Sequence, residues 1–274
     1  MPQPSDIARH YTRGHLAERI FDGLRAEGKD PGRLKPEDTS PVDQFHIRGR
    51  AATLELAQLA GIQPGWQVLD VGGGLGGPAR VLAREMRCQV TVLDLTEEFV
   101  RVGALLSERM DLAGLVHFRH GDAQDMPFVD GRFDAVWTQH STMNIRDKQR
   151  LYESARRVLR RGGRLAMHEV VAGPVQPVHY PTPWADSEEA SFLLSQEELR
   201  SLIGRCGFKE LAWQDVTEAS REWFERAAAP SVAPPPPLGL HLVLGQHAAQ
   251  MMRGQVLNLQ EGRVEVVMAA FERP

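Results

Sequence analysis

A glycine-rich turn between an apolar strand and a helix constrains this chain more than any other feature. Residues 66–71 form a short apolar run, and five of the next six residues are glycines. Pro78 then opens a helix at a position where a missing N–H group costs nothing. Glycines let the backbone turn sharply and approach a ligand closely. The turn therefore predicts a βαβ unit that binds a ligand at the start of its helix.

Strands and helices alternate along much of the chain. Helical spacing of apolar residues predicts helices over 78–86, 97–112, 147–160 and 196–206. Apolar or β-branched runs predict six further strands, at 89–95, 115–120, 133–138, 164–171, 208–216 and 263–271. This alternation favours βαβ units and an α/β fold, with a parallel sheet covered by helices on both faces.

The first sixty residues differ from this core. Residues 5–27 have the spacing of one or two short amphipathic helices, and residues 28–43 are expected to be a loop because they are rich in Gly and Pro. A helix over 50–60 is expected to end at Gly61. Residues 1–61 are therefore predicted to form an N-terminal helical arm.

Residues 62–274 are expected to form the core, together with two inserts at 173–195 and 217–262 that cover one edge of it. The Pro-rich run at 230–237 is typical of a stiff connector. The inserts bring in aromatic residues, so they are candidates for the wall of a binding pocket.

The composition excludes several classes of protein. Hydrophobic residues make up 42% and charged residues 25%, as in soluble globular proteins, and a net charge of −4 argues against a general nucleic-acid binder. Cys88 and Cys206 form no CxxC pattern, so neither a disulfide framework nor a metal site is predicted. The chain starts without a secretory signal pattern and has no apolar run fit to span a membrane, so a cytoplasmic location is expected.

The residues around the turn discriminate between cofactors. Gly72, Gly74 and Gly77 match the GxGxxG pattern of dinucleotide sites, and Asp94 closes the next strand, where a ribose-binding acid is expected. However, Asp70 precedes the first glycine by two residues, and its carboxylate would repel a pyrophosphate over the helix N-terminus. A ligand with a cationic amino-acid end and no phosphate, such as S-adenosylmethionine, suits this acid better.

Two later segments agree with this interpretation. Residues 121–128 read GDAQDMPF after the third strand, and residues 133–137 read FDAVW in the fourth. With these motifs in order, the sequence resembles the class I S-adenosylmethionine-dependent methyltransferases. More narrowly it is similar to a type 11-like, small-molecule group that includes sarcosine, tocopherol and sterol methyltransferases. The resemblance covers roughly residues 40–216, and its shared segments are 43–46, 74–80, 94–96, 139–140 and 157–163.

The resemblance implies a Rossmann-like, doubly wound sheet of seven mostly parallel strands with an antiparallel last strand. It also implies that Asp94 binds the ribose, Asp122 the adenine amino group and Leu95 the adenine face, with Gln44 and Gln139 at the methionine end. The full set of expected cofactor-binding residues is Asp70, Gly72, Gly73, Gly74, Asp94, Leu95, Asp122, Ala123, Gln139 and Gln44.

The acceptor is less constrained. A small molecule is expected, because residues 138–141 lack the [DN]PP[YF] motif of nucleic-acid amino-methylating enzymes and no basic stripe is present. Methylation of nitrogen, oxygen or carbon remains open, and a base is needed only if the nucleophile arrives protonated. His140, after the fourth strand, and His46, in the arm, are the candidate catalytic bases.

The insert after the fifth strand contains three residues that are candidates to line an acceptor pocket, namely His179, Tyr180 and Trp184. Two other functions remain as alternatives: an NAD(P)-dependent oxidoreductase, or a catalytically inactive cofactor-binding protein that acts through partners. The oligomeric state is left open between monomer and homodimer.

Overall fold

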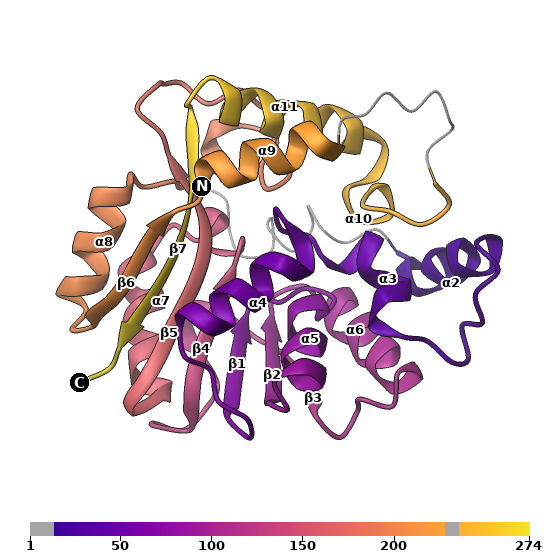
Figure 1. The fold of residues 1–274 in the computed structure, drawn as a ribbon, viewed down its shortest axis with the longest axis horizontal. Helices are drawn as coiled ribbons and strands as arrows, with labels where there is room; N and C mark the ends of the chain where they lie inside the picture. The colour runs from indigo at the N-terminus through magenta and orange to yellow at the C-terminus, as the bar shows by residue number, and fades with distance from the viewer. Residues whose placement is uncertain (1–13, 228–235) are drawn as a thin grey trace.

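The computed structural model describes residues 14–227 and 236–274, and their central feature is a seven-stranded sheet (Figure 1). The strands lie in the order β3-β2-β1-β4-β5-β7-β6. Their bounds are β1 Gln67–Val71, β2 Gln89–Asp94, β3 Val116–His120, β4 Phe133–Gln139, β5 Leu159–Ala172, β6 Lys209–Asp215 and β7 Val264–Glu272. Every predicted strand is present, so the predicted seven-stranded α/β fold is confirmed.

The strand directions show where a ligand site is expected. Strands β1 to β5 are mutually parallel, whereas β7 runs antiparallel between β5 and β6, as predicted. The chain first moves outward from β1 to β3 and then returns to β4 on the other side of β1. Ligands of such sheets bind beyond the carboxyl ends of the strands where the order reverses. Here those ends are Val71 and Gln139.

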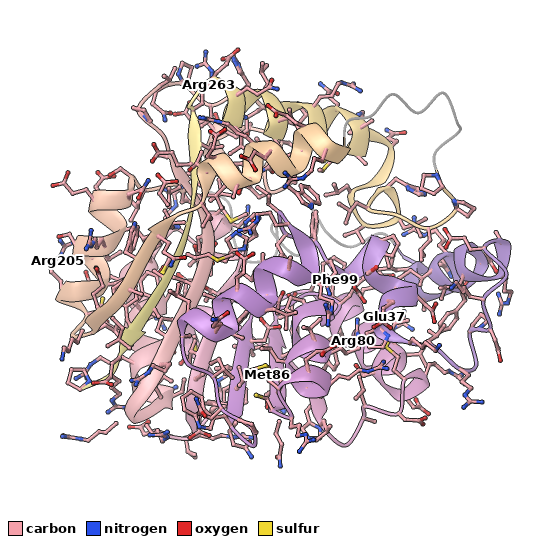
Figure 2. All side chains as sticks on the ribbon, in the orientation of Figure 1. Glu37, Arg80, Met86, Phe99, Arg205 and Arg263 are labelled. Atoms are coloured by element: carbon pink, nitrogen blue, oxygen red, sulfur yellow. The ribbon has the colours of Figure 1, made fainter. Side chains whose placement is uncertain are left out.

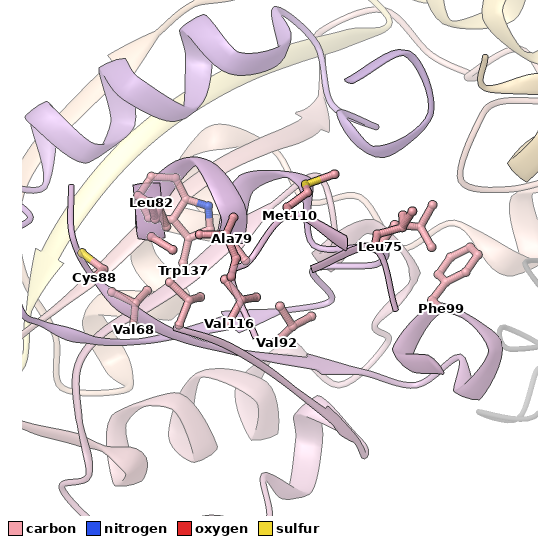
Figure 3. Packing of buried hydrophobic residues seen from close by; sticks show 14 of the residues in the cluster. Val68, Leu75, Ala79, Leu82, Cys88, Val92, Phe99, Met110, Val116 and Trp137 are labelled. Carbon is pink, nitrogen blue, oxygen red and sulfur yellow. The ribbon is translucent and has the colours of Figure 1, made fainter. Parts of the chain in front are cut away.

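Helices cover both faces of the sheet because alternate strand residues point to opposite sides. Val68 of β1 belongs to the core beneath α4, α5 and α6, whereas its neighbour Leu69 belongs to the core beneath α7 and α8. Figure 3 shows the first of these cores, with Leu82 of α5 close to Trp137 of β4. The bounds of these helices are α4 Gly49–Leu59, α5 Gly77–Glu85, α6 Glu97–Arg109, α7 Lys148–Val158 and α8 Gln196–Arg205.

Part of the region expected to be a loop is helical. Residues 28–43 include α3 (Pro36–Asp43), which the prolines concealed. The helix begins with a proline at its first turn, where no N–H group is needed, and the Lys35 N–H donates to the Asp38 side chain at 2.8 Å. The prediction of a loop was therefore wrong for the second half of this segment.

The junction between α7 and β5 also differs from the prediction. The helix was expected to continue to Arg160 and the strand to begin at Arg164, but α7 ends at Val158 and β5 begins at Leu159. Leu159 pairs with Phe133 of β4, and the register then shifts before the regular pairing resumes. Pairing across the sheet thus extends the strand over residues whose local pattern predicts a helix end.

Besides α3 and α4, the described residues of the arm and the later insert include α2 Leu16–Ala26, α9 Thr217–Ala227, α10 His241–Leu244 and α11 Ala248–Gln260. Figure 1 shows α9 and α11 side by side beyond the carboxyl end of β5. They bury a separate apolar cluster that includes Trp184, Phe224 and Leu259. The connector predicted at 230–237 lies mostly outside the described residues.

Candidate active site

A cavity of ≈ 310 Å³ lies beyond the carboxyl ends of β1, β2 and β4, and we call it the main cavity. The main cavity collects residues from the glycine turn, the ends of β2 and β4, the segment after β3 and the arm. Of the site residues predicted from the sequence, it is lined by His46, Asp70, Gly72, Gly73, Gly74, Asp94, Leu95, Asp122, Ala123, Gln139 and His140.

The glycine turn is packed tightly against the loop that follows β4. Gly72 has φ 69°, and a Cβ atom there would lie 2.5 Å from the Cβ of Ser141. The Ser141 hydroxyl donates to the Val71 carbonyl at 2.8 Å, and the Gly72 N–H donates to the Leu93 carbonyl at 2.7 Å. Glycine is required here both for the left-handed backbone and for the close approach.

Asp94 is held in a fixed orientation at the end of β2. One carboxylate oxygen accepts a hydrogen bond from the Gly74 N–H, and the other accepts one from the Thr96 N–H, both at 2.8 Å. Burial raises the pKa of Asp94, and these backbone hydrogen bonds oppose the rise. The oxygen bonded to the Gly74 N–H keeps a second lone pair, so the side chain can still accept a hydrogen bond from a ligand.

Asp70 lies in the main cavity without a hydrogen-bond partner for Oδ2 in the described part of the chain. The residue is only 1% exposed. Burial and the nearby Asp94 raise the pKa of Asp70 to about 7. A buried acid of this kind is stabilised as a carboxylate when a cationic group binds beside it.

Asp122 serves the local backbone as well as facing the main cavity. One of its carboxylate oxygens accepts a hydrogen bond from the Gln124 N–H at 2.8 Å and so caps the short helix Ala123–Asp125. Leu95 contributes an apolar wall on the opposite strand end. These residues line the part of the main cavity between the ends of β2 and β3.

The two glutamines occupy different places. The Gln139 side-chain oxygen accepts hydrogen bonds from Thr53 at 3.2 Å and from the Trp137 indole N–H at 3.1 Å, so protein partners already engage it. Gln44, expected at the cofactor, is absent from the lining of the main cavity and lines a neighbouring one. Its neighbour Asp43 lines the main cavity instead. The expectation for Gln44 is therefore not supported by its position.

His46 and His140 lie at one end of the main cavity, with their ring centroids 6.3 Å apart. The Nε2–H of His46 donates to the Gly49 carbonyl at 2.9 Å, and burial lowers the pKa of His46 to about 4. His140 has φ 51°, and its Nε2 atom is buried without a partner among the described residues. Burial, and then the proximity of His46, keep the pKa of His140 well below its usual value.

Comparisons with known proteins assign this arrangement to a family. A family model described as a methyltransferase domain matches residues 69–167. Sarcosine/dimethylglycine N-methyltransferase of Halorhodospira halochloris is 30% identical over 215 residues, which cover 78% of this chain and 76% of that protein. The chain belongs to the S-adenosylmethionine-dependent methyltransferases. The family resemblance inferred from the sequence is thereby confirmed.

Other comparisons show how far this methyltransferase matches its relatives. The 27-O-demethylrifamycin SV methyltransferase of Amycolatopsis mediterranei (strain S699) is 30% identical over 83% of this chain and 82% of that protein. The glycine/sarcosine/dimethylglycine N-methyltransferase of Actinopolyspora halophila is 28% identical, but the match spans only 32% of that protein's length. Geranyl diphosphate C-methyltransferase from Streptomyces coelicolor A3(2) has the same fold, with a TM-score of 0.71, 20% identity, and coverage of 100% of this chain and 98% of that one.

A buried ion pair attaches the arm of this methyltransferase to the helix after the glycine turn. The Arg80 guanidinium in α5 donates to the Asp43 carboxylate at the end of α3, at 2.7 Å, and both side chains are almost fully buried. A Cβ atom at Gly77 would lie 2.3 Å from the Asp43 carbonyl oxygen. Figure 2 labels Arg80, with Glu37 of α3 close by. Sequence reasoning assigned no role to this pair.

A third histidine and a glutamate were also missed. His168 of β5 is fully buried, and its ring centroid lies 4.6 Å from that of His140. The adjacent Glu169 accepts hydrogen bonds from the Ser141 and Thr142 N–H groups, at 3.2 and 3.3 Å, so it anchors the loop that carries His140. A sequence signal exists for both residues, because they interrupt a continuous apolar strand.

A second cavity of ≈ 60 Å³ shares Phe45, His46 and His140 with the main cavity, and we call it the inner chamber. The rest of its lining is Gln44, Ile47, Met143, Pro183, Trp184, Trp223, Phe224, Leu240, Met252 and Gln255. Of the three aromatic candidates in the insert, only Trp184 lines it.

The other two candidates lie elsewhere. Tyr180 packs beside the apolar cluster of the inserts, and His179 Nε2 forms a hydrogen bond with the Glu261 carboxylate at 3.0 Å near the surface. Within residues 14–227 and 236–274, no helix is long and apolar enough to cross a membrane. In the same ranges, no group of three or more His, Cys, Asp or Glu residues is arranged to hold a metal ion.

Proposed function

We propose that the main cavity binds S-adenosylmethionine and that the adjoining inner chamber presents a small-molecule acceptor to it. The observation that carries the proposal is the buried Asp70 carboxyl beside a glycine turn, whose Oδ2 atom has no partner among the described residues, because this position favours a cationic ligand end and disfavours a pyrophosphate. When bound, the cofactor supplies an electrophilic methyl group on a sulfonium.

Each expected cofactor residue has a separate task. Asp94 accepts hydrogen bonds from the ribose hydroxyls, since its carboxylate is already oriented by backbone N–H groups. Asp122 and Ala123 border the adenine, and Leu95 packs on its face. Gly72, Gly73 and Gly74 let the backbone approach the cofactor closely. Gln139 shapes the methionine end, because its hydrogen bonds with Thr53 and Trp137 fix its side chain.

His140 accepts the proton of a protonated acceptor. Two points support this role: the ring lines both cavities, and its Nε2 atom has no partner in the described residues. Because the pKa of His140 is depressed, the ring is neutral near pH 7 and has a lone pair available. His46 forms the facing wall and restricts the approach of the acceptor.

The arm of residues 1–61 and the inserts at 173–195 and 217–262 act as a cap on the core. Val42, Phe45 and His46 of the arm and Phe192 of the first insert line the main cavity. Exclusion of water and alignment of the two reactants are what an in-line displacement requires, and alignment alone is worth ~7–11 kcal/mol in well-oriented systems.

The relatives differ in the atom that they methylate. The names of the two relatives at 30% identity indicate a nitrogen acceptor in one and an oxygen acceptor in the other. A neutral histidine without a partner favours oxygen, because a hydroxyl must lose its proton whereas an amine can bind already deprotonated. We also propose a cytoplasmic location and no nucleic-acid substrate, in line with the composition.

Cofactor binding tests the proposal first. Isothermal titration should show that S-adenosylhomocysteine binds the wild-type protein and that Asp94→Ala weakens binding by about 1–3 kcal/mol through lost charged hydrogen bonds. Stabilisation by NAD(H) and not by S-adenosylhomocysteine would contradict it. Methyl transfer from labelled S-adenosylmethionine to any member of an acceptor panel would then exclude a catalytically inactive binding protein.

A further inference from the structure

The inner chamber has a lining without formal charge. Its described lining residues include no Lys, Arg, Asp or Glu, and burial keeps its two histidines neutral near pH 7. A carboxylate or ammonium group placed there would lose its hydration without gaining an opposite charge. The chamber therefore selects against charged acceptors.

Aromatic and aliphatic side chains make up most of the wall. Trp184 comes from the first insert, whereas Trp223 and Phe224 come from α9 and Met252 from α11. Flat aromatic side chains provide large apolar contact surfaces and stack favourably on other rings. A ring or a compact hydrocarbon therefore fits this wall better than a flexible polar chain.

Three polar atoms of the chamber lining lack partners within the described residues: the side-chain oxygen of Gln44, the side-chain nitrogen of Gln255 and Nε2 of His140. They come from the arm, from α11 and from the loop after β4. Gln255 is only 3% exposed, so its unsatisfied amide is costly unless a ligand pairs with it. A hydroxyl group can accept a hydrogen bond from the Gln255 amide and donate its one proton to the neutral imidazole of His140.

We infer that the inner chamber binds the reacting end of an uncharged, ring-bearing hydroxyl compound, and that the enzyme is an O-methyltransferase for such acceptors. This inference rests on the proposed function, since the chamber is useful only beside a bound methyl donor. In the reaction, a lone pair of the acceptor oxygen forms the new bond to the methyl carbon as the carbon–sulfur bond breaks. The released electron pair stays on sulfur, giving S-adenosylhomocysteine, and the hydroxyl proton passes to His140.

The chamber is small, but its boundary allows a larger acceptor. Gln44, Trp223 and Leu240 also line an outer groove of ≈ 340 Å³ between the arm and α5. These three side chains therefore separate the chamber from the groove. The groove is charged, since Glu37, Arg50, Arg80, Arg84 and Glu85 line it, so the selection against charge concerns the reacting end of the acceptor. The part of the acceptor that does not react extends past Trp223 into the groove.

Binding to the protein saturated with S-adenosylhomocysteine tests this inference without requiring turnover. The probes are 2-naphthol, 2-naphthoate and sarcosine, which offer a neutral ring hydroxyl, a charged ring acid and a zwitterion, each measured by isothermal titration. We expect 2-naphthol to bind at least about tenfold more tightly than either other probe, because charged groups pay an uncompensated desolvation cost. Equal or tighter binding of 2-naphthoate or sarcosine, or no binding of 2-naphthol, would overturn the inference.

A charge placed in the chamber should reverse this preference. Gln255→Lys is expected to weaken the binding of 2-naphthol and to strengthen the binding of 2-naphthoate, each by about tenfold. Gln260→Lys, at the exposed end of the same helix, is the matched control and should change neither affinity. An unchanged preference in a folded Gln255→Lys protein would count against the chamber as the binding site.

A second variant covers the case in which a buried lysine disrupts folding. Trp223→Ala should weaken 2-naphthol at least about fivefold through lost ring contact, whereas Trp213→Ala in β6, outside the chamber, should not. Each variant is first tested for unchanged affinity for S-adenosylhomocysteine. If the wild-type protein does not bind S-adenosylhomocysteine, the proposed function is refuted. If it binds S-adenosylhomocysteine but shows the wrong probe preference, only the acceptor class is refuted.

Discussion

At the scale of single residues, the cofactor half of the site depends on the buried carboxyl of Asp70, one oxygen of which has no partner in the described part of the chain. Asp70 ends up buried because β1 is a central strand with neighbours on both sides. Ionising a carboxyl there is unfavourable, and the nearby Asp94 adds repulsion, so the pKa of Asp70 rises to about 7. A bound cation removes this penalty, so ligand binding is coupled to the release of a proton from Asp70.

The affinity for S-adenosylmethionine should accordingly depend on pH. Below pH 7 the free protein holds a proton on Asp70 that binding must release, so affinity rises with pH up to about 7 and falls by up to about tenfold per unit below it. Titration calorimetry at pH 6 in two buffers of different ionisation enthalpy should detect the released proton. Asp70→Asn is expected to bind more weakly at pH 7.5 and to lose this dependence; an equally steep dependence in the variant would assign the proton to another group.

The proton acceptor at the other end of the site makes a second residue-scale prediction. His140→Ala should lower kcat by about 10²–10⁴-fold with an acceptor that must lose a proton, and leave the affinity for S-adenosylhomocysteine nearly unchanged. Since the pKa of His140 is well below its usual value, kcat of the wild-type enzyme at saturating cofactor should not fall between pH 7.5 and pH 6. A fall in kcat centred near pH 6.5 that disappears in the variant would show that His140 titrates as an ordinary, solvated histidine.

At the scale of elements, the arm is attached to the core through the start of α5. Arg80 and Asp43 are both buried, so removal of one leaves the other charge without compensation. Arg80→Ala should lower the free energy of unfolding by about 3–5 kcal/mol, measured in urea. Arg84→Ala, one turn further along α5, is the control. Arg84 forms a solvent-exposed ion pair with Glu37 at 3.9 Å, and such a pair contributes only about 0–1 kcal/mol to the free energy of unfolding. A similar effect of the two substitutions would show that the arm is not held by the buried pair.

The elements also show what a sequence pattern can and cannot predict. The central strands β1 and β2 were predictable because each is a buried apolar run next to a turn signal. The helix α3 was not, since its two prolines are local signals for a loop, whereas its stability comes from contacts with α5 that are distant in sequence. The same reason explains why the start of β5 was not predicted, since its first residue is set by pairing with β4.

At the scale of the whole molecule, the two halves of the site differ in how far apart their residues lie in the sequence. Half of the residues that line the main cavity lie within residues 70–123, in successive βαβ units, so ordered motifs reveal them. The inner chamber combines Gln44, His140, Trp223 and Gln255, which only the packing of arm, core and insert brings together. The sequence therefore predicted the cofactor and the motifs that line the main cavity, expected Gln44 at the cofactor although it lines the inner chamber, and left the acceptor undefined.

Because the arm and the core both line the main cavity, a ligand there should stabilise them as one unit. At a concentration of S-adenosylhomocysteine of about 100 times its Kd, the free energy of unfolding should rise by about 2.7 kcal/mol. Hydrogen exchange should slow at residues 42–46 of the arm and 140–147 after β4, since both segments line the main cavity. Helix α8 lines neither cavity and is the internal control. Protection confined to the glycine turn, with no change in the arm, would show that the cofactor binds the core alone and that the arm serves only the acceptor.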